Sequence, residues 1–163
     1  MINFRHVASA PSPVDELPDV GRLRDFYETF GSLLLYHDDQ SGDAGKYVAT
    51  PAQWADLQDH FGGWVEPLDE EERTEILPDW ISDCQVIGET PRSGNYILMP
   101  TQGQKTGRVF EFDHDGFEFS EVASDLVEYV QQLLDLDARR LTEKLSKNPS
   151  PCGRGAGVRV VFQ

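Results

Sequence analysis

The spacing of apolar residues changes along the chain, from a helical period in the first half to a strand-like alternation after residue 84. Val20, Leu23, Tyr27 and Phe30 recur at intervals of three and four residues, which predicts an amphipathic helix that ends at Gly31.

A second helix is predicted over residues 50–63. Thr50 is in place as its N-cap, Pro51 suits its first turn, and Gly62 is expected just past its end. A third, short helix over 68–80 starts with acidic residues, Glu70 to Glu72, which suit the positive end of a helix dipole. These three glutamates form either a binding patch or, as the simpler interpretation, a solvated helix start.

Strands are predicted from short apolar or alternating runs bounded by turn residues. Two lie before residue 84, at 32–36 and 46–49. Four lie after it, and turns join them into an antiparallel meander, at 84–89, 96–100, 108–112 and 117–121.

A long apolar stripe then predicts a C-terminal helix from Ser124, as its N-cap, to the prolines at 149 and 151. Residues 1–16 are expected to be an irregular lead-in, 17–147 a single domain, and 148–163 a tail rich in proline and glycine. The run 158–162 is compatible with an edge strand. The predicted fold class is α+β, with a central antiparallel sheet of about four to six strands flanked by helices.

Asp115-Gly116 between two alternating runs predicts a β-hairpin with a type I′ turn. The register that follows pairs Asp113 with Glu118 and places four phenylalanines on one face, packed against helices. Glu111, Asp113 and Glu118 share the other face.

Two carboxylates directly opposite each other in a hairpin are mildly destabilising, by roughly 0.2–1 kcal/mol. Three interpretations compete for Asp113 and Glu118. In a calcium loop, Phe117 and Phe119 would occupy positions that need oxygen ligands, and an acid/base pair would need a nucleophile or pocket beside it. A charged solvent face that at most serves as an acidic binding surface fits best, so we assign no catalytic, cofactor-binding or metal-binding residue.

Charge narrows the choice of partner. The 163 residues contain 29 Asp and Glu against 14 Lys and Arg, a net charge of −15. This excess disfavours binding to nucleic acid or to an anionic membrane and favours encounter with a basic protein. The chain shows no apolar run of membrane-spanning length and no secretory signal, and its two cysteines have no CxxC spacing. We therefore expect a cytoplasmic protein.

The order of these segments resembles the SUKH superfamily, which includes the yeast Smi/Knr cell-wall regulators. The resemblance rests on "LPDVGRLRDFYETFGSLLLY" (17–36), "LPDWISDCQVIGE" (77–89), "SGNYILM" (93–99), "GRVFEFDHDG" (107–116) and "SDLVEYVQQLLD" (124–135). It implies an α+β domain without enzymatic activity. In bacteria it implies an immunity protein that binds and neutralises a toxin, often a basic nuclease. Gly21, inside the first predicted helix, departs from good helix sequence.

The predicted function is thus a protein-binding module that covers a basic toxin with an acidic surface. The candidate contacts are Asp38, Asp39, Glu111, Asp113, Asp115 and Glu118, with Trp64 as an aromatic anchor. One alternative is a regulatory scaffold for a cellular partner, and the last is a hydrolase that uses Asp113 and Glu118.

Overall fold

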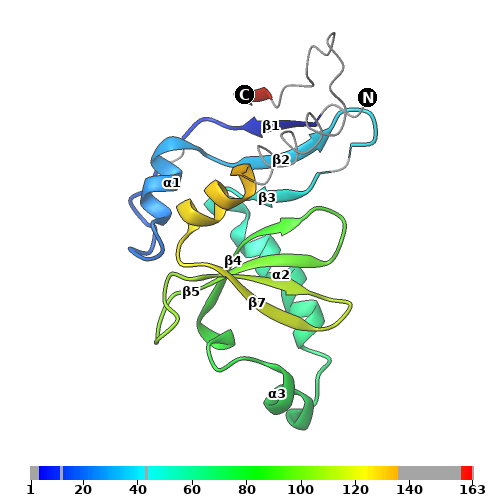
Figure 1. Ribbon diagram of the computed structural model, residues 1–163. Coiled ribbons are helices and arrows are strands. Elements are labelled where there is room, and N and C mark those ends of the chain that lie inside the picture. The colour runs from blue at the N-terminus through cyan, green and yellow to red at the C-terminus, as the bar shows by residue number, and fades with distance from the viewer. Residues whose placement is uncertain (1–3, 12, 43, 136–158, 163) are drawn as a thin grey trace.

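Eight strands form one sheet in a computed structural model that describes residues 4–11, 13–42, 44–135 and, for the backbone alone, 159–162 (Figure 1). The strands are β1 (Phe4–Ala8), β2 (Leu33–Asp38), β3 (Lys46–Val48), β4 (Cys84–Thr90), β5 (Asn95–Pro100), β6 (Val109–Asp113), β7 (Glu118–Ala123) and β8 (Arg159–Phe162). The helices are α1 (Leu23–Thr29), α2 (Trp54–Val65) and α3 (Glu70–Ile76), with 3₁₀ turns η1 (Pro51–Gln53) and η2 (Ile81–Asp83) and a C-terminal helix described over 126–135.

Strands β1 to β7 lie side by side in chain order and are all antiparallel, so the predicted α+β fold with a meander is confirmed, with more strands than expected. The lead-in predicted to be irregular contains β1, which is a correction. The prolines at 11 and 13 favour irregular backbone, but they lie after the strand, in which alternate residues, His6 and Ala8, are buried. Strand β8 pairs in parallel with β1 and forms one edge of the open sheet, in the region where an edge strand was expected.

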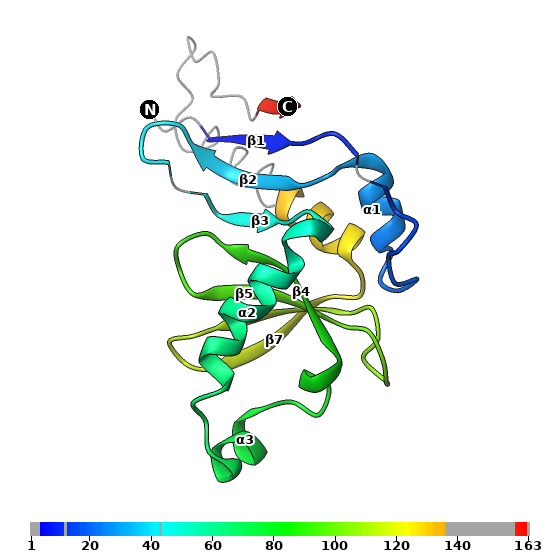
Figure 2. The ribbon, with the colours of Figure 1, turned by 180° about the vertical axis from the view of Figure 1, so that it is seen from behind.

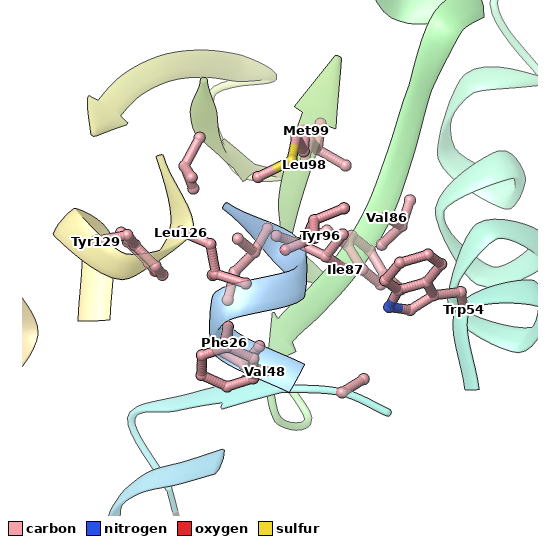
Figure 3. Packing of buried hydrophobic residues seen from close by; sticks show 14 of the residues in the cluster. Phe26, Val48, Trp54, Val86, Ile87, Tyr96, Leu98, Met99, Leu126 and Tyr129 are labelled. Carbon is pink, nitrogen blue, oxygen red and sulfur yellow. The ribbon is translucent and has the colours of Figure 1, made fainter. Parts of the chain in front are cut away.

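The two faces of the sheet are covered by different helices. The helix 126–135 lies in front of the sheet in Figure 1, and α2 lies in front of it when the molecule is seen from behind in Figure 2. On the α2 face, Phe61 packs edge-on against Tyr96 and Phe112, with ring centroids 5.7 and 5.2 Å apart. The core is thus built from both sides of one sheet, and Figure 3 shows its centre around Trp54, Ile87 and Leu126.

Helix α1 begins at Leu23, three residues after Val20, the first residue of the predicted apolar stripe, because the preceding backbone is not helical. Gly21 and Arg22 both have positive φ, 56° and 57°. The carbonyl of Gly21 accepts the backbone N–H of Leu126 (3.0 Å), and Gly107 lies directly against it. Gly21 therefore allows the segment before α1 to pack closely against Gly107. It is not a weak point within a helix.

Two other helix ends differ from the sequence prediction. Helix α2 runs through Gly62 to Val65. The C-terminal helix begins at residue 126, and Asp125, rather than Ser124, caps it by accepting the backbone N–H of Glu128 (2.8 Å). Its predicted continuation over 136–147 and the tail up to residue 158 lie outside the described residues.

Candidate partner-binding surface

The β6–β7 hairpin has the register that the sequence predicted. Asp113 faces Glu118, Phe112 faces Phe119, and Glu111 faces Ser120. The turn itself differs, because the hairpin closes through the four residues 114–117 and the positive φ belongs to Phe117 (51°), so it is not a type I′ turn. The ring of Phe117 packs edge-on against that of Phe112 (5.0 Å), and this contact draws Phe117 back onto the apolar face.

His114, at the tip of this hairpin, is held in a fixed position by the neighbouring strand. The side-chain oxygen of Asn95 accepts the backbone N–H of His114 (3.0 Å) and lies 2.6 Å from His114 Nδ1. Because that oxygen has no proton to donate, Nδ1 must be the protonated ring nitrogen. The ring of Trp64, from the end of α2, lies 5.0 Å from the imidazole.

Trp64, the candidate aromatic anchor, is 37% exposed, and its role as an anchor stays a prediction. Gly94 lies beneath the indole, where an added Cβ would come within 2.9 Å of a Trp64 ring carbon. The tip of the β4–β5 turn, the tip of the β6–β7 hairpin and the end of α2 thus meet at one aromatic pair, Trp64 and His114.

Three of the predicted acidic contacts lie at the same hairpin tip as His114. Asp113, Asp115 and Glu118 are all exposed, and Asp115 Oδ1 lies 3.2 Å from His114 Nε2. Among the described residues, Asp113, His114 and Asp115 are the group that could hold a metal ion, with ligand atoms within 4.8 Å of one another. A structural zinc site has four protein ligands, so an ion at these three would depend on water or a partner for the rest.

Glu111 does not belong to the exposed group, because the C-terminal helix covers its face of the sheet. Its carboxylate accepts a hydrogen bond from the Tyr129 hydroxyl (2.7 Å) and pairs with Lys46 Nζ (2.9 Å), which also donates to Thr90. Burial, and then the neighbouring carboxylate, raises the pKa of Tyr129. Glu111 therefore serves a polar network within the protein, with 30% of its side chain still exposed, and its assignment as a partner contact stays a prediction.

Asp38 and Asp39 lie elsewhere in the sheet. Their strand, β2, is separated from β6 by three other strands, about 19 Å at the usual strand spacing. Hydrogen bonds from the Gln40 backbone and the Ser41 hydroxyl lower the pKa of Asp38, and Asp39 pairs with Arg5 (2.6 Å). Asp38 stabilises the turn after β2, Asp39 links that turn to Arg5 on β1, and the structure does not bring either carboxylate to the Trp64 pair.

The densest negative charge lies on a helical segment, and three of its glutamates, Glu70 to Glu72, were expected to be a solvated helix start or a binding patch. Residues 51–83 contain ten carboxylates against one arginine, Arg73, which gives a net charge of −9. All ten are exposed: Asp56, Asp59, Glu66, Asp69, Glu70, Glu71, Glu72, Glu75, Asp79 and Asp83. We call these ten residues the acidic helical surface, and Trp64 lies in the middle of their segment.

Helix α3 carries four of these ten carboxylates and takes no part in the core. None of its residues is buried, Ile76 is 39% exposed, and the views in Figures 1 and 2 place it beyond one end of the sheet. Local bonds define the helix instead: Asp69 and Glu72 form a reciprocal capping box, and Arg73 donates to the carbonyls of Leu68 and Glu66. The absence of an apolar stripe in "EEERTEI" was the sequence signal for an unpacked helix.

Glu89, on β4 opposite Tyr96, gives a pH-dependent prediction. Burial raises the pKa of its carboxyl above the ordinary value for glutamate, and the nearby charge of His60 acts in the opposite direction. The folded state then holds the proton more tightly than the unfolded state, so this residue's contribution to stability falls as pH rises through that range.

We expect Glu89→Gln to be at least as stable as the parent protein at pH 7, with the advantage shrinking as the pH falls through the raised pKa of Glu89 toward 4.5. Urea unfolding at several pH values measures this difference. The exposed change Glu118→Gln is the control. A Glu89→Gln protein that is less stable than the parent at pH 7 would contradict the assignment.

Fold and surface together define an α+β protein built on seven antiparallel strands, with an acidic helical surface and an aromatic pair beside it. Comparisons of the chain with protein-family models, with curated proteins and with solved structures each returned no match. Among the described residues, no helix has both the length and the apolar character that a bilayer crossing requires.

Proposed function

We propose that this protein is a non-enzymatic binding module, an immunity protein of the SUKH type that neutralises a basic toxin of a bacterial toxin system, with a nuclease as the first candidate. The observation that carries the proposal is the acidic helical surface, where ten exposed carboxylates face solvent against one arginine. Helix α3 within it buries no residue, and its carboxylates other than Glu72 of the capping box have no role in the core.

The mode of action that we propose is occlusion. A surface of net charge −9 attracts the basic active-site region of a nuclease, which has evolved to bind phosphates, and speeds the encounter. Trp64 and Ile76 then supply exposed apolar area within the charged surface, where a few desolvated side chains set the dissociation rate. The acids around His114 extend the same surface across the hairpin tip.

The test is protection of cells that produce the toxin encoded beside this gene. We expect the parent protein to restore growth and the charge-reversed variant Glu71→Lys/Glu75→Lys to lose protection, with an association rate at low salt at least about tenfold lower. Both positions are exposed, and neither belongs to the capping box.

The matched control is Glu28→Lys/Asp135→Lys, which changes the net charge equally at exposed positions outside the acidic helical surface. Equal loss of protection by both variants would show that total charge, not this surface, matters. A gene with no toxin neighbour and a protein that protects against none would favour the alternative of a regulatory scaffold.

A further inference from the structure

A hollow beside the start of α2 combines apolar walls with an acidic rim. It has a volume of about 380 Å³ and is lined by Pro13, Asp15, Glu16, Leu17, Pro51 and Trp54. This volume is near the lower end for ligand sites, which span about 300–1,000 Å³, so the hollow admits one side chain or a small molecule.

The apolar part of the hollow is held in place by the core. Leu17 and Trp54 are each only 8% exposed, and the Tyr27 ring packs edge-on against the indole at 5.9 Å. Tyr27 is itself fixed, because its hydroxyl donates to the carbonyl of Ala49 (2.5 Å). The floor is therefore a rigid aromatic surface that exists before any ligand arrives.

The polar part comes from one turn of the 9–22 loop. The backbone N–H of Leu17 donates to the carbonyl of Val14 (3.2 Å), and this turn presents Asp15 and Glu16 in succession as Leu17 points into the core. Both carboxylates are exposed, so they can meet a cation without first breaking a buried contact.

We propose that this hollow is a binding site for an arginine side chain of the partner protein. The two carboxylates would repel an anionic ligand. A wholly apolar ligand would leave both carboxylates without an interaction partner in the hollow. Arginine suits both parts, because its guanidinium stacks on an indole and binds carboxylates through paired N–H donors. The identity of the partner rests on the proposed function, whereas the site itself does not.

The probe is Nα-acetyl-arginine amide, titrated into the full chain and followed by the indole N–H signals of the three tryptophans in ¹H–¹⁵N spectra. Trp64→Phe and Trp80→Phe assign the remaining signal to Trp54 without altering the floor of the hollow. We expect the Trp54 signal to shift most. Nα-acetyl-citrulline amide, which has nearly the same shape but no charge, should bind at least about tenfold more weakly.

The variant Asp15→Asn/Glu16→Gln should weaken binding of the arginine probe at least fivefold, and Asp19→Asn, an exposed acid on the same loop but outside the hollow, should not. Equal binding of the citrulline probe, a shift centred on Trp64 or Trp80, or an equal effect of Asp19→Asn would overturn the site. Arginine binding at Trp54 combined with full toxin protection by Glu71→Lys/Glu75→Lys would overturn the proposed surface and leave the arginine site standing.

Discussion

Replacing Gly21 by alanine is expected to destabilise the protein by about 3 kcal/mol, the larger of the two strongest effects that the structure predicts. A Cβ at this position would lie 2.5 Å from the carbonyl oxygen of Gly107 and 2.5 Å from the end of the Met99 side chain. Met99 is flexible enough to move, but the Gly107 backbone is not. The positive φ of Gly21 adds strain that a non-glycine residue would have to bear.

The control is Gly103→Ala. Gly103 also has a positive φ (85°), but an added Cβ there meets nothing within 4 Å. It should therefore cost only about 1 kcal/mol, the strain alone. Urea unfolding of both variants measures the difference, and equal costs would show that the contact between Gly21 and Gly107 is not as close as the structure has it.

Replacing Glu111 by alanine is expected to cost about 2 kcal/mol, because it leaves the Tyr129 hydroxyl and the Lys46 ammonium without the carboxylate that joins them. The figure is kept below that of a fully buried pair, since the Glu111 and Lys46 side chains are 30% and 22% exposed.

A double-mutant cycle with Tyr129→Phe separates the network from the single residues. We expect a coupling energy of roughly 1 kcal/mol, within the range for residues that share a network. Glu118→Ala, on the same hairpin but exposed, should change stability by less than about 0.5 kcal/mol. If Glu111→Ala behaved like Glu118→Ala, the carboxylate would belong to the exposed group after all.

These two residues also show what the sequence could and could not predict. Alternation placed Glu111 correctly on the face opposite the phenylalanines, because side chains in a strand alternate with period two. Whether that face meets water depends on a helix about 15 residues further along, and local pattern has no access to such packing. Gly21 was wrongly placed inside a helix for the same reason, because Gly107, against which it packs, is distant in sequence.

The hairpin register was predicted from Asp115-Gly116, but the turn type was not. The loop includes Phe117, whose packing against Phe112 overrides the local preference of the Asp-Gly pair. Trp64 was a candidate anchor on the condition that it is exposed, and the fold meets that condition. The acidic helical surface was visible as composition, yet the exposure of every residue of α3 became evident only from the fold.

Helix α3 adds no side chain to the core, so most substitutions on it should leave global stability within about 0.5 kcal/mol. In most helices a substitution that alters binding also lowers the stability of the fold. In α3 we expect this coupling only at the capping box. Substitutions at Glu70, Glu71, Glu75 and Ile76 therefore need no compensating mutations elsewhere in the fold. Under the proposed function, homologues that bind different toxins should differ most along these roughly two turns of helix.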